Sequence, residues 1–141
     1  MPRFQLILCE RTGRWSAELR RAGILPLRET RSLSECSDAL RGAARAAVLM
    51  ELDAVNLAAA SEWLAERERA FPFAQTSVAL PCALQSQEPW LRELGVRQVL
   101  YRDQDVEPFV RRLRQRQTPI EPSDEELLHE LLTDPQSLRI N

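Results

Sequence analysis

Short apolar segments alternate with amphipathic segments along most of this chain. The apolar segments fall at residues 4–9, 24–27, 46–51, 77–80 and 99–101, and each is too short for a buried helix. The amphipathic segments carry apolar residues at helical spacing, and each begins near a residue that can cap a helix: Thr12, Ser32, Asn56, Ser86 and Asp105. Five successive strand–helix units predict an α/β fold, with a doubly wound and mostly parallel sheet covered by helices on both faces.

Chain-breaking residues refine this prediction. Pro26 lies in the second apolar segment and has no amide hydrogen to donate, which favours an edge position for that strand. A stiff, proline-containing stretch at 117–122 then separates a domain at 1–116 from a short segment at 123–141. That last segment predicts a short amphipathic helix whose leucines form one stripe: Leu127, Leu128, Leu131 and Leu132. A helix this short is marginal alone, so we expect it to dock on its own domain, on a partner or on a second copy.

Composition narrows the classes of function. The 141 residues carry a net charge of -2, which gives no general attraction to nucleic acid or to an anionic membrane. Every basic residue is arginine, which excludes a P-loop lysine or a Schiff-base lysine. The three cysteines (9, 36 and 82) and the single histidine, His129, lack the spacing of a zinc site, so we expect three small buried thiols, no metal and no cofactor. No signal peptide or membrane span is apparent, and the expected location is the cytoplasm.

The position that points most directly to function is Glu51, an acid at the end of the apolar run 46–50. Open parallel sheets place their chemistry at the carboxyl ends of their strands. The run Ala47-Val48-Leu49-Met50-Glu51, together with the stretch 91–102, resembles a response-regulator receiver domain, the CheY-like family. The resemblance covers residues 4–116 and implies a five-stranded sheet in the order 2-1-3-4-5, with the family's phosphoacceptor position at Glu51.

The resemblance also implies that the reactive positions of a receiver are altered here. Its acidic pair falls on Glu10 and Arg11, its acceptor aspartate on Glu51, its hydroxyl on Pro81 and its lysine on Arg102. The charges of Glu10, Arg11, Glu51 and Arg102 sum to zero, which makes a poor Mg²⁺ site, and Pro81 cannot hydrogen-bond a phosphoryl group. Phosphotransfer of the usual kind is therefore not expected.

Two hypotheses follow for this degenerate phosphoacceptor pocket. Glu51 and Arg102 could form an ion pair that locks one signalling state, or Glu51 could be a solvated acid in an inert pocket. A longer third strand would instead make Asp53 the acceptor, but that register would drive Glu51 into the sheet interior, and we disfavour it.

Without phosphotransfer, the protein would function by binding other molecules through its surface. The resemblance implies a docking or dimerisation face on the fourth helix, fifth strand and fifth helix, here carrying Trp90, Arg97, Tyr101, Arg111 and Arg112. We therefore predict a pseudo-receiver, a non-enzymatic module for protein–protein interaction or homodimerisation that does not bind nucleic acid or membrane. The alternatives are a regulator phosphorylated at a non-standard acid, and a small flavodoxin-like enzyme or binding protein, for which a thiol site at Cys9 and Cys82 is conceivable. The sequence does not name the partner, the pathway or the oligomeric state.

Overall fold

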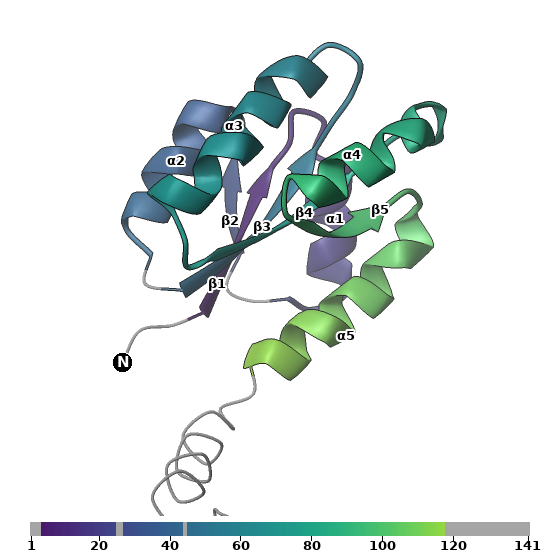
Figure 1. Cartoon of the computed structure of the whole chain (residues 1–141). Coiled ribbons are helices and arrows are strands. Elements are labelled where there is room, and N and C mark those ends of the chain that lie inside the picture. The colour runs from purple at the N-terminus through teal and green to yellow at the C-terminus, as the bar shows by residue number, and fades with distance from the viewer. Residues whose placement is uncertain (1–3, 25–26, 44, 118–141) are drawn as a thin grey trace, which may run out of the picture. The chain divides into compact units, whose positions relative to one another are not determined.

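Five strands form one parallel sheet in the structure, a computed structural model that describes residues 4–24, 27–43 and 45–117 (Figure 1). The strand order is β2-β1-β3-β4-β5. The strands are β1 (Phe4–Cys9), β2 (Leu27–Thr30), β3 (Arg45–Glu51), β4 (Ala74–Ala79) and β5 (Val96–Leu100). This order is that of the flavodoxin/CheY-like α/β fold, so the predicted fold class is confirmed.

The helices cover both faces of the sheet. They are α1 (Arg14–Arg21), α2 (Leu33–Arg41), α3 (Leu57–Ala70), α4 (Glu88–Glu93) and α5 (Val106–Gln117), with two 3-10 turns, η1 (Cys82–Gln87) and η2 (Asp103–Asp105). Helices α2, α3 and α4 lie over one face, whereas α1 and the first part of α5 lie over the other (Figure 1). In β1 and β3 the residues alternate between the two faces and both sets are largely buried, which explains why these two strands are mostly apolar.

The chain divides into two compact units, Met1–Arg111 and Arg112–Asn141. The described part of the second unit is the end of α5, including Arg112. The predicted linker lies outside the described residues except for Gln117, which ends α5, and so does the C-terminal segment with Leu127, Leu128 and Leu131.

The second strand lies three residues later than predicted, at Leu27–Thr30 instead of 24–27. Ile24 is buried because it closes the end of α1, where its amide donates to the Leu19 carbonyl oxygen at 3.2 Å. β2 pairs only with β1, so it is an edge strand as predicted, and one exposed side lets it carry Arg28 and Glu29. A prediction from apolar residues alone therefore gave the wrong position for this strand.

The fourth helix also begins later than predicted. Ser86 lies inside the 3-10 turn η1, and α4 starts at Glu88. Pro89 stands in the first turn of α4, where its missing amide hydrogen leaves no helical hydrogen bond unmade. Strand β4 begins three residues earlier than predicted, because the polar residues Gln75 and Thr76 continue its pairing with β3. Strand β5 also begins three residues earlier, because Val96 already pairs with β4.

Candidate functional site

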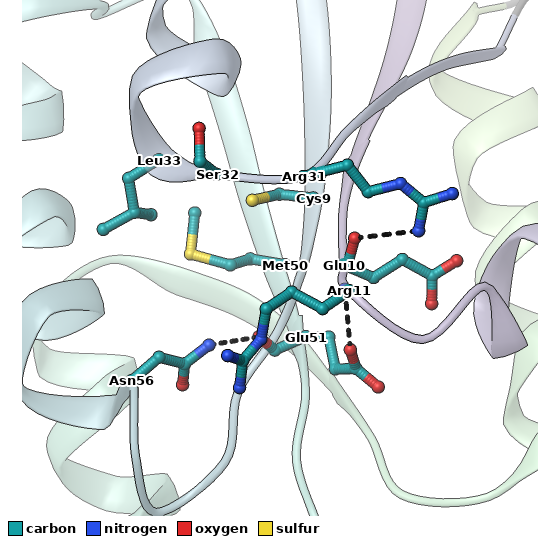
Figure 2. A pocket seen from close by; sticks show the side chains of 9 residues that line it. All are labelled: Cys9, Glu10, Arg11, Arg31, Ser32, Leu33, Met50, Glu51 and Asn56. Atoms are coloured by element: carbon teal, nitrogen blue, oxygen red, sulfur yellow. Dashed lines mark hydrogen bonds between the residues drawn. The ribbon is translucent and has the colours of Figure 1, made fainter.

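A cavity of about 170 Å³ opens where the strand order reverses, between the carboxyl ends of β1 and β3 (Figure 2). Three of the five residues predicted for the phosphoacceptor pocket line it, Glu10, Arg11 and Glu51. Pro81 follows β4 and is exposed, and neither it nor Arg102 is among the lining residues. The other lining residues are Cys9, Arg31, Ser32, Leu33, Met50 and Asn56.

Glu10 turns its carboxylate onto the start of helix α1. It accepts hydrogen bonds from the backbone amides of Trp15 at 2.9 Å and Ser16 at 2.8 Å, and one from the Thr12 hydroxyl at 3.3 Å. The N-cap residue of α1 is Gly13, which has no side chain, so Glu10 caps the helix together with the predicted residue Thr12, whose hydroxyl oxygen accepts from the Arg14 amide at 3.2 Å. The Glu10 side chain is buried, and its charge also complements the positive end of the helix dipole.

Glu51 binds the loop that joins β1 to α1. One of its carboxylate oxygens accepts from the Arg11 backbone amide at 3.2 Å, and the other accepts from the Thr12 hydroxyl at 3.0 Å. Thr12 therefore stands between the two acids of the pocket, in contact with both Glu10 and Glu51. Both carboxylates are bonded to residues 11–16 of the chain itself.

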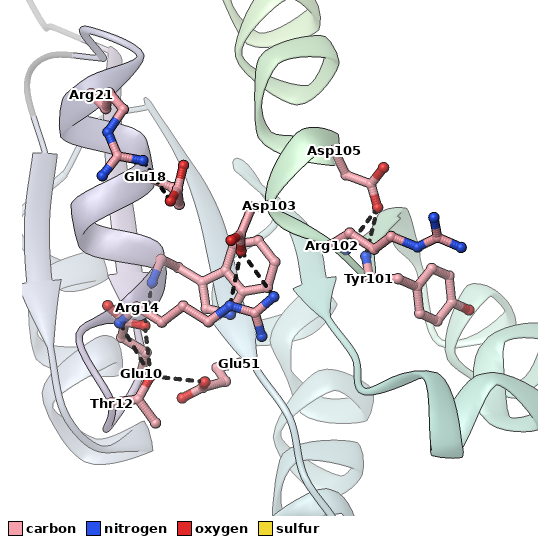
Figure 3. Close-up of polar contacts among 11 residues, drawn as sticks. Glu10, Thr12, Arg14, Glu18, Arg21, Glu51, Tyr101, Arg102, Asp103 and Asp105 are labelled. Carbon is pink, nitrogen blue, oxygen red and sulfur yellow. Dashed lines mark hydrogen bonds and ion pairs between the residues drawn. The ribbon is translucent and has the colours of Figure 1, made fainter.

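The ion pair predicted between Glu51 and Arg102 is not formed: the salt bridges among the described residues do not include it. The Arg102 side chain is exposed, and Figure 3 shows it directed away from Glu51. The backbone explains this direction, because the amides of Tyr101 and Arg102 both donate to the Asp105 carboxylate, at 2.8 and 3.0 Å, and turn the chain into η2. The hypothesis of a lock by this pair is therefore wrong.

Two other ion pairs tie the loops around the pocket together. Arg11 pairs with Asp53 at 2.8 Å, which connects the loops after β1 and β3, and Arg14 pairs with Asp103 at 2.9 Å, which connects α1 to the segment after β5 (Figure 3). All four side chains are substantially exposed, so each pair contributes little stability alone.

Asp53 belongs to the start of helix α3. Its carboxylate accepts from the backbone amides of Val55 and Asn56, both at 2.8 Å. The bond to the Asn56 amide is the main reason that the pKa of Asp53 is lowered, and Arg11 lowers it further. β3 ends at Glu51, two residues before Asp53, which agrees with the strand register that we favoured.

Several residues at or beside the pocket were not predicted as site residues, among them Thr12, Arg14, Arg31, Asn56 and Asp103. Thr12 was predicted only as a helix cap. The separation of Arg14 and Asp103 by 89 positions left no local signal of their pairing. Arg14 follows β1 and Asp103 follows β5, so both lie near the carboxyl ends of the parallel strands. Their opposite charges were the available clue to the pair.

The predicted interaction surface is built around α4 and β5. Trp90 is 50% exposed, and Arg97 and Arg111 are also exposed. Tyr101 is half-buried instead, packs beside Val99 against the core, and donates its hydroxyl hydrogen to Glu88. Arg92 donates to the same Glu88 carboxylate at 2.8 Å and to the Arg97 carbonyl oxygen of β5 at 3.0 Å, so α4 is fastened to β5.

Tyr101 provides a test of this fastening, because it is the chain's one tyrosine. Burial and the bond to the Glu88 carboxylate raise its pKa, so we expect its ultraviolet titration to fall above the value of about 10 of a free tyrosine. The folded protein favours the neutral phenol over the phenolate. The contribution of Tyr101 to stability is therefore complete below about pH 10 and is lost as the pH rises toward the pKa of Tyr101 in the folded protein. Glu88→Gln should lower the folded pKa part of the way, since burial remains. A wild-type titration at the free value would refute the contact.

The described residues also bear on metal and membrane binding. They include no group of three or more His, Cys, Asp or Glu side chains that could hold a metal ion. Within the same ranges, no helix has both the length and the apolar character needed to cross a bilayer. The chain matches no known protein-family model, and it matches no curated protein.

Proposed function

We propose that this chain is a pseudo-receiver, an interaction module that works without phosphorylation. The observation that carries the proposal is the state of Glu10 and Glu51, the acids at two reactive positions of a receiver. Both are hydrogen-bonded to the loop and helix start at residues 11–16, which makes them structural groups. Membership of the receiver family is itself part of this proposal.

The electrostatics of the pocket favour the same conclusion. Phosphoryl transfer in this fold needs a divalent cation and a cation-binding cluster of carboxylates. Here Glu10 and Glu51 already accept hydrogen bonds from backbone amides and from the Thr12 hydroxyl, while Arg11 and Arg14 pair with Asp53 and Asp103 in the surrounding loops. Bringing Glu10 to a metal would uncap α1, so the metal would have to replace the hydrogen bonds that it breaks.

Incubation with acetyl phosphate and Mg²⁺ tests the loss of chemistry. We expect intact-mass spectrometry to find no phosphoryl adduct on the full-length chain under conditions that label an ordinary receiver run in parallel. A hydroxylamine-sensitive adduct mapped to Glu51 or Asp53 would overturn the proposal and restore the alternative of a non-standard phosphoacceptor.

The surface around Trp90 supports the interaction half of the proposal. Trp90 on α4 is half-exposed and Arg97 on β5 is exposed, and tryptophan and arginine are residue types that dominate binding hot spots. The partner would be a protein or a second copy of this chain, and we place this module in the cytoplasm. The arginines Arg97 and Arg111 favour an acidic contact surface on that partner.

Matched variants test the surface. Trp90→Ala should weaken self-association, measured by sedimentation, or capture of a partner by about 30-fold or more, as expected for a hot-spot residue. Val55→Ala is the control, because Val55 is also exposed and apolar but lies between β3 and α3, away from α4. Equal effects of the two substitutions, or no effect of Trp90→Ala, would refute this assignment.

A further inference from the structure

The described part of the chain contains a second chemically distinctive group beside the pocket, a pair of thiols. Cys9 ends β1 and Cys36 lies in α2, which packs against that strand, and both belong to the same buried cluster. Cys9 also lines the 170 Å³ cavity, with its side chain on the side where Ser32 and Leu33 begin α2 (Figure 2). Cys36 is fully buried behind it. All three thiols were predicted to be buried. Cys82 is exposed instead, at the start of η1, where no residue is buried.

We propose that Cys9 and Cys36 form a redox-responsive pair, in which a small hydroperoxide enters the cavity, oxidises Cys9, and Cys36 then closes an intramolecular disulfide. The proposal concerns a modification site and stands independently of the interaction function.

The environment of each thiol assigns its role. Interaction with the neighbouring Cys36 thiol lowers the pKa of Cys9 against the opposing effect of burial. The same interaction, together with burial, raises the pKa of Cys36. The thiolate is the reactive form of cysteine, so the nucleophile is Cys9, the thiol that lines the cavity. Cys36 stays protonated until Cys9 has reacted, which is the role of a resolving thiol.

The reaction balances with hydrogen peroxide as the oxidant. The Cys9 thiolate attacks one peroxide oxygen, an S–O bond forms, the O–O bond breaks, and the leaving hydroxide takes up a proton to become water. The Cys36 sulfur then attacks the Cys9 sulfenic acid, an S–S bond forms, the S–O bond breaks, and the departing hydroxide leaves as water with the Cys36 proton. The two thiols are together oxidised by two electrons, and one peroxide is reduced to two waters.

The cavity also sets the size of the oxidant. Its volume of about 170 Å³ is enough for a few molecules the size of water, and hydrogen peroxide has only two heavy atoms. Cumene hydroperoxide carries the same reactive bond on a bulky aromatic group. We therefore expect hydrogen peroxide to oxidise Cys9 at least about tenfold faster than cumene hydroperoxide does, because access limits the reaction of a buried thiol.

The test uses the full chain with Cys82→Ser, which removes the exposed thiol and prevents disulfides between molecules. After treatment with hydrogen peroxide at neutral pH and denaturation in the presence of an alkylating agent, we expect a loss of two hydrogen atoms, no alkylation, and a peptide linked through Cys9 and Cys36. With Cys36→Ala added, Cys9 should stop as a sulfenic acid that dimedone captures. With Cys9→Ala added, Cys36 should remain reduced.

Three outcomes would overturn the proposal. Two are full alkylation of both thiols after treatment of the folded protein, and oxidation that occurs only once urea has unfolded it. The third is equal oxidation of Cys36 in the Cys9→Ala variant, which would show that the cavity thiol is not the site of attack. Circular dichroism of each variant before treatment ensures that only folded protein is compared.

Discussion

Glu10→Ala should lower the free energy of unfolding by about 2–3 kcal/mol, measured by urea denaturation. The substitution leaves the backbone amides of Trp15 and Ser16 without the carboxylate that binds them, and both residues are buried. Water cannot fully replace that acceptor, so the loss exceeds that of an exposed cap. It also removes a negative charge from the positive end of α1.

The sign of this change separates a structural acid from a metal ligand. Acids gathered for a cation repel one another when the cation is absent, so removing one of them would leave stability unchanged or increase it. Glu62→Ala is the control, because Glu62 is an exposed glutamate on α3, and it should change the unfolding free energy by less than about 0.5 kcal/mol. A Glu10→Ala protein as stable as this control would contradict the capping role.

Gly95→Ala should lower the free energy of unfolding by about 2–4 kcal/mol, from two sources. Gly95 adopts a φ of 99°, which costs an alanine about 1–2 kcal/mol. An added Cβ would also lie 2.5 Å from a terminal nitrogen of Arg67, which is buried and donates through its other terminal nitrogen to the Ala74 carbonyl oxygen at 2.8 Å. Moving that guanidinium weakens the link between α3 and the start of β4.

Gly13→Ala isolates the first source. Gly13 has a φ of 84°, but an added Cβ would meet no atom within 4 Å, so we expect only the conformational cost of about 1–2 kcal/mol. Gly95→Ala should lower the free energy of unfolding by more than Gly13→Ala does. This additional loss should disappear in an Arg67→Met background, because a methionine side chain can move aside without losing a hydrogen bond. Equal losses for Gly13→Ala and Gly95→Ala in the wild-type background would show that Arg67 does not constrain Gly95.

The buried elements could be predicted from the sequence, whereas the edge elements could not be placed accurately. Strands β1 and β3 are covered on both faces, so their apolar runs mark them nearly to the residue. Strand β2 has one neighbour and tolerates charged residues, while the apolar Ile24 beside it closes helix α1. Thr76 is completely buried within β4, so a polar residue in the pattern did not mark the end of that strand.

The location of the candidate site could be predicted, but its bonding could not. The ends of β1 and β3 bring Glu10, Arg11 and Glu51 to one cavity, as the order of the elements implies. Which acid meets which donor depends on loop conformation. Asp105 turns the backbone at Arg102, and Gly13 leaves α1 uncapped so that Glu10 serves it. Neither effect has a periodic signature, and so the predicted pair of Glu51 with Arg102 was wrong.

The acids of the pocket serve the fold in this account, and carbon-13 NMR of the Glu10 and Glu51 carboxylates during a Mg²⁺ titration tests that claim most directly. We expect both carboxylate signals and the Arg11 amide signal to stay where a sodium chloride titration of equal ionic strength leaves them. A saturable shift of both carboxylates, specific to Mg²⁺, would show that these groups bind a cation and would contradict the account.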